Sequence, residues 1–244
     1  MTSNHNGNSR VNAKRLRWPG RRGQPKPSIP AGATERVTQV HESGGKATSE
    51  FWFRGRLTGR AFWDSDGSLC MAVGLRDGVP VGNQLEFQDG ALVYAEPFVK
   101  GLLHGTAKQF DAQGRLLLVS PFTQGTGTDF WCDERGRLSE EHPLVAGKPS
   151  GTERWWNPDQ KTVYSETEWL NGEWHGATRH WTGGRLDRGF PKFYVRGKQV
   201  AKGAYVRLAA RDPSLPPYRQ EADTPVRTLP KTFLELKQRA RRRR

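Results

Sequence analysis

Pairs of glycines four residues apart recur along this chain at a nearly constant interval. The pairs are Gly55/Gly59, Gly78/Gly82, Gly101/Gly105, Gly147/Gly151 and Gly172/Gly176. With Gly125 included, the first glycines are 23, 23, 24, 22 and 25 residues apart. A period in the low twenties indicates a tandem array of one structural unit. Arrays of short repeats are more often binding surfaces than catalysts.

Each unit also carries an aromatic residue, a turn and an aliphatic residue in a fixed order. The aromatic residues are Trp63, Phe87, Phe110, Trp156 and Trp181. The segments between turns are about five to eight residues long, which favours strands over helices. Glycine supplies the positive φ angles that hairpin turns require. The sequence therefore predicts an all-β fold, in which tandem β-hairpin repeats of about 23 residues form an elongated, twisted antiparallel sheet over residues 48–208. Almost no helix is expected before residue 230.

Four prolines recur at the same position in their units. Pro97, Pro121, Pro143 and Pro191 each lie five residues after the aliphatic residue of their unit. Proline has no N–H to donate to a strand ladder, so it is confined to edges, bulges and strand starts. The four prolines therefore predict a recurrent bulge or a break in the ladder.

On these motifs the chain resembles the MORN repeats, and more closely the bacterial MORN-variant arrays grouped with the YwqK-family antitoxins. The segment Trp169-Leu-Asn-Gly-Glu-Trp-His-Gly-Ala is similar to the family's aromatic–x–Asn–Gly–x–x–x–Gly core, and the resemblance covers roughly residues 51–205. The eukaryotic repeat has a third glycine where this chain has Ala61, Gln84, Ala107, Glu153 and Thr178, which favours the variant type. The resemblance carries no catalytic residues and implies an antitoxin-like or immunity-like role.

The basic charge of the chain is concentrated at its two ends. Residues 1–50 hold 9 basic and 3 acidic residues, a net charge of +6, and residues 187–244 hold 16 and 5, a net charge of +11. Residues 51–186 hold 14 and 17, a net charge of −3. We predict a basic, mostly disordered arm over residues 1–47, and a Pro-rich linker with an Arg-rich tail over residues 209–244.

The end of the tail could form a short helix within otherwise flexible basic termini. Thr232 and Glu235 have the spacing of a capping box, and Phe233, Leu234 and Leu236 could dock such a helix on the sheet. The arginines at its C-terminal end would interact favourably with the helix dipole.

The basic ends have three interpretations. They could bind the phosphates of RNA or DNA, an anionic membrane surface or an acidic protein. The candidate polyanion-binding residues are Arg15, Arg17, Arg21, Arg22, Arg239, Arg241, Arg242, Arg243 and Arg244. The sequence has no RNP motif, zinc finger or helix-turn-helix that would read a nucleic-acid sequence.

Tryptophans in the last units are the candidate partner-binding residues. They are Trp155, Trp156, Trp169, Trp174 and Trp181. Trp155 and Trp156 are adjacent, so their side chains should point to opposite faces of a strand. An exposed tryptophan on a sheet is a plausible hot spot for a protein partner. The alternative is that a loop or the tail covers these rings.

Little in the sequence supports catalysis or metal binding. His104 and His175 precede second glycines and fit a repeat consensus, and Glu166 and Glu168 share one strand face, where exposed acids are far more common than catalytic ones. No cluster of cysteine and histidine has metal-ligand spacing, so we expect neither metal nor cofactor.

Cys70 and Cys132 are expected to be reduced thiols, as in a cytoplasmic protein, and no signal peptide or apolar membrane span is visible. The sequence thus favours a non-enzymatic, cytoplasmic scaffold that binds a protein partner. Nucleic acid and an anionic membrane remain alternatives, and the open ends of the sheet leave self-association open.

Overall fold

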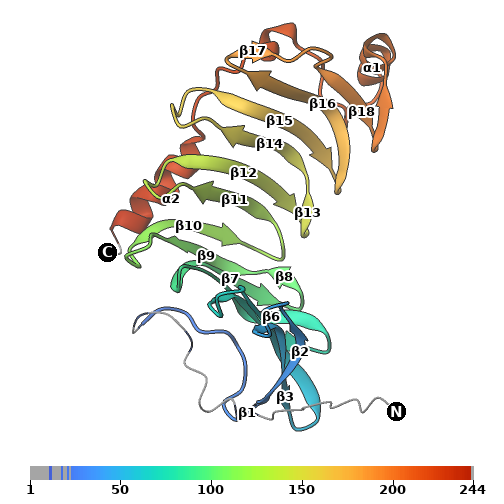
Figure 1. Cartoon of the computed structure of the whole chain (residues 1–244). Coiled ribbons are helices and arrows are strands. Elements are labelled where there is room, and N and C mark those ends of the chain that lie inside the picture. Colours follow the sequence, from blue (N-terminus) through green and yellow to red (C-terminus); the bar gives the residue numbers. More distant parts are fainter. Residues whose placement is uncertain (1–10, 13–17, 19–20, 22, 243–244) are drawn as a thin grey trace. The chain divides into compact units, whose positions relative to one another are not determined.

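The computed structural model describes residues 11–12, 18, 21 and 23–242, and these are mostly antiparallel β-sheet (Figure 1). The all-β class predicted from the sequence is therefore confirmed. The chain divides into two compact units, Met1–Leu116 and Leu117–Arg244.

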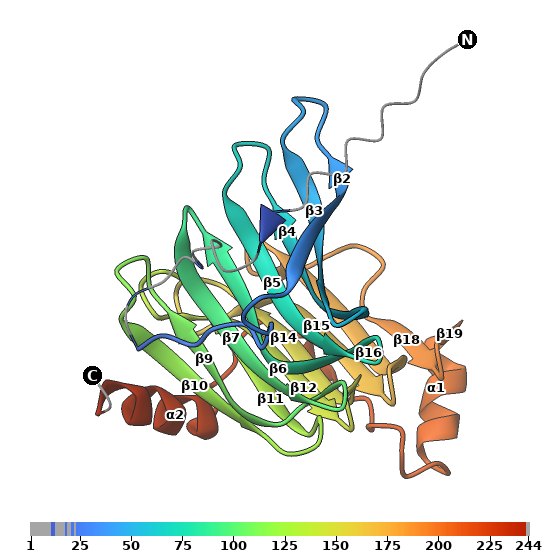
Figure 2. The same ribbon diagram turned by 90° about the horizontal axis from the view of Figure 1, so that it is seen from below.

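The first unit is an antiparallel meander. Its strands are β1 (Val11–Asn12), β2 (Thr34–Val40), β3 (Lys46–Phe53), β4 (Arg56–Trp63), β5 (Leu69–Arg76), β6 (Val79–Gln88), β7 (Ala91–Val99), β8 (Leu102–Leu103) and β9 (Gly105–Phe110). They are hydrogen-bonded in the order β1-β2-β3-β4-β5-β6-β7-β9, and β8 pairs with β7. Figure 2 shows these strands from below. Because consecutive strands are neighbours, each side-chain face runs across the whole meander.

The N-terminal segment packs on this first sheet, which corrects the prediction of a disordered arm up to residue 47. The strand β2 begins at Thr34 and pairs with β3. The ring of Trp18 lies 5.7 Å from that of Phe51, and Ile29 and Ala33 belong to the same hydrophobic core. The sheet therefore starts at β2, before residue 48. The apolar side chains of Trp18, Ile29 and Ala33 dock the preceding segment on it.

The second unit continues with β10 (Leu116–Phe122), which begins at the last residue of the first unit. The later strands are β11 (Gly127–Cys132), β12 (Leu138–Val145), β13 (Lys148–Pro149), β14 (Gly151–Trp156), β15 (Val163–Leu170), β16 (Glu173–Thr182), β17 (Arg185–Leu186), β18 (Lys192–Val195) and β19 (Lys198–Val200). They form a sheet in the order β11-β12-β14-β15-β16-β18-β19, with β13 paired to β12 and β17 to β16.

The hairpins turn at residue pairs that both have positive φ. The angles are 53° and 81° at Asp77-Gly78, and 53° and 89° at Asn171-Gly172. Two successive positive φ angles are the signature of the type I′ turn, whose twist matches that of the strands. Gly78 and Gly172, the first members of the glycine pairs Gly78/Gly82 and Gly172/Gly176, therefore lie in hairpin turns.

The predicted break in the ladder is found at two of the prolines. Strand β7 pairs with β9 up to Ala95 and with β8 from Phe98, and β12 pairs with β14 up to Glu141 and with β13 from Leu144, so the ladder is interrupted beside Pro97 and beside Pro143. Each of these prolines also packs against a glycine: a Cβ on Gly105 would lie 3.2 Å from Pro97 Cγ, and one on Gly151 would lie 3.1 Å from Pro143 Cγ.

A helix ends the sheet of the second unit, contrary to the expectation of almost no helix before residue 230. The helix α1 (Lys202–Ala209) lies beside β18 (Figure 2). Its Tyr205 is fully buried and packs at 4.9 Å from the ring of Phe193. Burial of this ring stabilises a helix that is too short to be stable alone.

Residues 212–230, which we call the C-terminal strap, lie on the second sheet rather than forming a free linker. Val163 N–H donates to Pro225 O and Arg227 N–H to Lys161 O, both at 2.9 Å. Leu215 is buried, and the strap contains one 3₁₀ turn, η2 (Gln220–Asp223).

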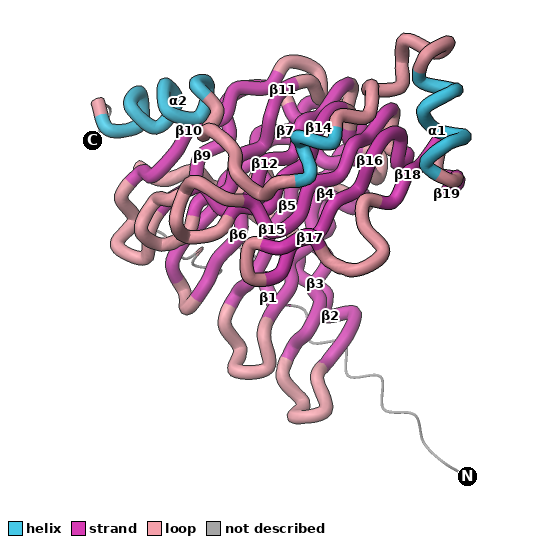
Figure 3. Tube along the Cα trace, turned by 90° about the horizontal axis from the view of Figure 1, so that it is seen from above, coloured by secondary structure: helices cyan, strands magenta, loops and turns pink. Residues whose placement is uncertain are grey.

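The chain then forms the helix α2 (Lys231–Arg241), which Figure 3 shows beside β10 and β11. The side chains of Phe233 and Leu236 are buried, with Phe233 5.7 Å from the ring of Phe130, whereas Leu234 is 49% exposed. The N-cap residue is Pro230 and makes no side-chain cap, so the capping box expected from Thr232 does not form. The C-terminal segment is thus part of the folded unit.

Candidate functional site

The two faces of the second sheet carry different side chains. Residues directly opposite on neighbouring strands share a face. One row on the first face contains Trp131, Glu140, Trp155, Ser165 and His180, and the next row on that face contains Asp129, His142, Glu153, Thr167 and Thr178. We call this the outer face. The intervening residues Glu141, Arg154, Glu166 and Arg179 form a row on the other face, which we call the strap face because the C-terminal strap binds there.

An unbroken series of aromatic rings crosses the outer face. It runs through His142, Trp155, Tyr164, His180 and Phe190, with successive ring centroids 5.6, 6.2, 6.4 and 6.0 Å apart. We call these five residues the aromatic ladder. They come from β12, β14, β15, β16 and the segment before β18. Tyr164 is 36% exposed and the His180 side chain 45% exposed, so the ladder is accessible to a ligand.

Carboxylates fix the indoles and one imidazole of this face. Trp155 Nε1–H donates to Glu153 Oε1 at 3.1 Å, and Trp131 Nε1–H donates to Asp129 Oδ2 at 2.9 Å. His142 lies between two acids, with Nε2 2.8 Å from Glu140 and Nδ1 3.2 Å from Glu153. These three rings are thus held in one orientation before any ligand binds.

Hydrogen bonding makes His142 a cation. Burial disfavours its charge, but the bonds to Glu140 and Glu153 outweigh burial and raise the pKa of His142 to about 9. Burial also disfavours the charged form of Glu153, which by itself would raise the pKa of this carboxyl. The hydrogen bonds from His142 and Trp155 outweigh burial and bring the pKa of Glu153 below its usual value. At neutral pH the first ring of the ladder is therefore an imidazolium flanked by two carboxylates.

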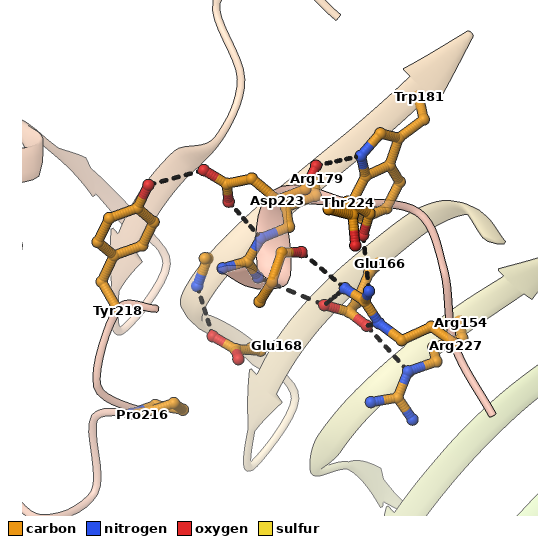
Figure 4. A network of polar contacts seen from close by, with 12 residues as sticks. Arg154, Glu166, Glu168, Arg179, Trp181, Pro216, Tyr218, Asp223, Thr224 and Arg227 are labelled. Atoms are coloured by element: carbon orange, nitrogen blue, oxygen red, sulfur yellow. Dashed lines mark hydrogen bonds and ion pairs between the residues drawn. The ribbon is translucent and has the colours of Figure 1, made fainter. Parts of the chain in front are cut away.

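A buried network of ions occupies the strap face (Figure 4). Glu166 Oε2 accepts hydrogen bonds from Arg154 Nε and Arg227 Nε, both at 2.9 Å. Its Oε1 accepts from Arg227 Nη2 at 3.0 Å and from Arg179 Nη1 at 3.3 Å. Burial raises the pKa of Glu166, but Arg227 and Arg154 outweigh it and hold that pKa below its ordinary value. This carboxylate, which the sequence suggested would be exposed, is the centre of a buried cluster.

The same network anchors the strap at Asp223. Arg179 Nε donates to Asp223 Oδ1 at 2.9 Å, and the Tyr218 hydroxyl donates to Asp223 Oδ2 at 2.7 Å. Trp181 Nε1–H donates to the backbone oxygen of Asp223 at 2.8 Å. These contacts bind the strap to the sheet.

A pocket of 280 Å³ adjoins this network and is lined by Thr152, Arg154, Glu166, Glu168, Arg179, Pro216, Pro217, Arg219, Ala222 and Arg227. Three of its arginines bind Glu166, so the carboxylates of the pocket offset much of its positive charge. Burial raises the pKa of Glu168, which accepts a hydrogen bond from Ala177 N–H at 2.6 Å. Because Arg154, Arg179 and Arg227 all pair with Glu166, a structural role is favoured for these pocket residues.

The five predicted tryptophans do not form one surface. Trp156 and Trp181 are buried, each 3% exposed. Trp155 belongs to the aromatic ladder. Trp169 and Trp174 pair across β15 and β16 with their rings 6.0 Å apart, and Trp174 also lies 4.7 Å from Tyr194. These two tryptophans form a separate cluster near the turn at Asn171-Gly172.

The structure also places four of the predicted polyanion-binding arginines. Arg21, Arg239, Arg241 and Arg242 are exposed. Arg15, Arg17, Arg22, Arg243 and Arg244 lie outside the described residues.

Sequence reasoning missed Trp131 and four members of the ladder: His142, Tyr164, His180 and Phe190. An acid two residues before a tryptophan was an available signal, since it occurs at Glu50/Trp52, Asp129/Trp131 and Glu153/Trp155, and the carboxylate accepts from the indole in all three.

Both cysteines carry free thiols, and burial raises the pKa of Cys132 to about 12. Among the described residues no group of three His, Cys, Asp or Glu side chains could hold a metal ion. No helix in the described part of the chain is long and apolar enough to cross a membrane. The sequence matches no model of a protein family and no curated protein.

Proposed function

We propose that this chain is a non-enzymatic β-hairpin repeat protein that binds a protein partner through the outer face of its second sheet. The observation that carries the proposal is the partly exposed aromatic ladder, opposite a face that the chain covers with its own strap. Aromatic residues are enriched at the centres of protein interfaces, where a few of them supply most of the binding energy. Trp155 is the second ring of the ladder and its only tryptophan, which makes it the best candidate for such an anchor.

Turn geometry supports the repeat of about 23 residues that forms part of this proposal. A residue with positive φ followed by a glycine with positive φ occurs at seven regularly spaced positions: Arg54-Gly55, Asp77-Gly78, Lys100-Gly101, Gln124-Gly125, Ala146-Gly147, Asn171-Gly172 and Arg196-Gly197. The glycines of these seven pairs are 23, 23, 24, 22, 25 and 25 residues apart, and two further pairs, Asp89-Gly90 and Gly183-Gly184, lie between them. With the resemblance to MORN-variant arrays, this favours an antitoxin-like or immunity-like protein, and the free thiols fit a cytoplasmic location.

The charge of the outer face favours a protein over a nucleic acid as the partner of the ladder. Asp129, Glu140, Glu153 and Asp187 lie beside or between its rings. These carboxylates would repel phosphates, whereas the polar rim of a protein interface accommodates both signs of charge.

The exposed arginines of α2 support a second candidate function. Arg239, Arg241 and Arg242 are exposed at the end of a helix whose other side is docked on the sheet. Such a fixed cationic end could bind the phosphates of RNA or DNA, and the same arginines would suit an anionic membrane.

Site-specific photocrosslinking in cells that contain the protein would test the first candidate. A photoreactive residue in place of Tyr164 should crosslink to a protein, and the additional substitution Trp155→Ala should abolish that adduct. The same photoreactive residue at Val145, which is exposed at the end of β12, serves as the control. An equal yield at both positions, or adducts formed only with nucleic acid, would contradict the proposed surface.

A further inference from the structure

The rings of the aromatic ladder do not form a flat platform. The planes of His142 and Trp155 cross at 86°, those of Trp155 and Tyr164 at 54°, and those of Tyr164 and His180 at 77°. A surface that stacks successive sugar rings or nucleobases needs aromatic faces that point the same way. Crossed rings that touch edge to face present edges and faces in turn, and a small, rigid apolar ring such as proline can pack against either.

The spacing of the first row along the outer face matches one type of peptide backbone. Trp131 and Trp155 face each other across Glu140, and His180 stands two strands beyond Trp155. Two strand intervals measure about 9.6 Å. A polyproline II helix places every third residue about 9.3 Å further along its axis. A β-strand repeats its side chains about every 6.8 Å and an α-helix turns every 5.4 Å, so both match less well.

The outer face also offers the hydrogen-bond donors that such a peptide needs. A polyproline II segment makes no internal hydrogen bonds, so its carbonyl groups accept from the protein that binds it. Tyr164 is 36% exposed, and its phenol hydroxyl can donate to such a carbonyl group. The chain already holds its own Pro-rich strap in this way, since Tyr205 donates to Pro216 O and Trp181 donates to Asp223 O.

A contact within the first unit shows that a cation can pack on an indole that a carboxylate holds. The Arg36 guanidinium lies over the Trp52 ring at 4.8 Å, and Arg60 pairs with Glu50, the acid that binds the Trp52 indole. Trp155 has the same bond to Glu153, but His142 occupies the cross-strand position that Arg36 has beside Glu50. At Trp155 the imidazolium of His142 already fills this position and pairs with Glu140, so a basic residue of the ligand would instead be attracted by the carboxylates that outnumber this cation on the outer face.

Resting on the proposed function, we infer that the partner presents a proline-rich segment in the polyproline II conformation, with a basic residue next to its prolines. Prolines three residues apart would pack next to Trp131, Trp155 and His180, and Tyr164 would donate to the ligand backbone. This is the recognition mode in which preformed Pro-x-x-Pro segments bind aromatic grooves.

The experiment measures fluorescence anisotropy of a labelled oligoproline peptide flanked by arginines, titrated with the full-length chain. We expect saturable binding that weakens at least tenfold when alternating glycine and serine replace the prolines. Trp131→Ala and Trp155→Ala should also weaken it at least tenfold, and Tyr164→Phe, which removes only the hydroxyl, should weaken it several-fold. Trp174→Ala is the matched control, because Trp174 is exposed on the same sheet but outside the ladder, and it should bind like the unmodified chain.

Equal binding of the glycine–serine peptide, or no binding of the oligoproline peptide, would overturn the inference. Displacement of the bound oligoproline peptide by a soluble cello-oligosaccharide or an oligouridylate would also overturn it, because the ladder would then accept a sugar or a nucleobase. If the photoreactive residue at Tyr164 still gives a Trp155-dependent protein adduct while the oligoproline peptide fails to bind, the inference is wrong and the proposed function stands. A protein adduct insensitive to Trp155→Ala contradicts the proposed function itself.

Discussion

Arg227 of the C-terminal strap donates hydrogen bonds to both carboxylate oxygens of Glu166 in β15. Its Nε lies 2.9 Å from Oε2 and its Nη2 3.0 Å from Oε1, although the two residues are 61 positions apart in the sequence. This pair joins the strap to the sheet in the middle of a buried ion cluster.

Removal of Arg227 should therefore destabilise the second unit. We expect Arg227→Ala to lower the free energy of unfolding by about 1–3 kcal/mol, because Glu166 stays buried and loses a bidentate partner. Arg154 and Arg179 still bind Glu166, which limits the loss. Urea unfolding measures the effect. Arg219→Ala is the control, since Arg219 lines the same pocket but is exposed, and a loss as large as that of Arg227→Ala would contradict this role.

The pair of acids around His142 should make stability depend on pH. The pKa of His142 is raised to about 9 from an ordinary value of 6.5, so the folded state binds the proton more tightly than the unfolded state. The stabilisation is complete below pH 6.5 and is lost as pH rises through about 9, by on the order of 2 kcal/mol. Urea unfolding between pH 6 and pH 9.5 should show this loss. His142→Gln should abolish it and Glu140→Gln should reduce it, whereas an unchanged pH dependence in His142→Gln would contradict the assignment.

Close packing of a glycine against a carboxylate leads to a third prediction. Gly176 has a φ of 144°, and a Cβ there would lie 2.1 Å from Glu168 Oε2 and 2.5 Å from Glu168 Cβ. Gly176→Ala should lower the free energy of unfolding by about 1–3 kcal/mol, from backbone strain and from the displaced side chain. Gly183→Ala is the matched control, because Gly183 also has a positive φ but no atom within 4 Å of the added Cβ. Thermal unfolding should show a larger loss of stability for Gly176→Ala. Equal losses in the two variants would contradict a contribution from the contact with Glu168.

The β-sheet fold was visible in the sequence because its signals are local. Turn pairs such as Asp77-Gly78 depend on adjacent residues, and glycine marks their positive φ wherever they occur. The short helix at the C-terminal end was also predicted, whereas the docking of the N-terminal segment and of the strap was not. Ile29 and Leu215 are single apolar residues next to prolines, and what buries them is a surface assembled from distant segments.

The candidate site was only partly predictable for the same reason. Trp155 was identified from its residue type, whereas Tyr164 and His180 join it only through the register of β14, β15 and β16. A bulge beside Trp155 places Tyr164 in the ladder, and no local pattern marks it. Glu166 looked like an exposed strand acid because its partner Arg227 comes from a strap that the composition described as a linker.

Docking of α2 gives a prediction with a matched pair of neighbouring residues. Phe233 is 1% exposed and packs on Phe130, whereas Leu234 is 49% exposed. Phe233→Ala should lower the free energy of unfolding by about 3–5 kcal/mol, because it removes a buried ring and leaves a cavity. Leu234→Ala should change it by less than about 0.5 kcal/mol. Similar urea midpoints for both variants would show that α2 does not stabilise the sheet in solution.

Charge at the end of α2 is best tested by substitution, since deletion of residues 231–244 would also remove Phe233 and Leu236 from the core. The exposed residues Arg239, Arg241 and Arg242 can be replaced together by glutamine, which retains helix propensity and removes the positive charge. The triple variant should melt like the unmodified chain and elute from heparin at lower salt. The unmodified chain should lose affinity for RNA steeply between about 50 and 200 mM salt, because binding releases counterions from the phosphates, and the variant should show a shallower slope. Unchanged heparin elution and an unchanged salt slope would show that these three arginines do not bind the polyanion, and would leave the aromatic ladder as the principal binding surface of the described chain.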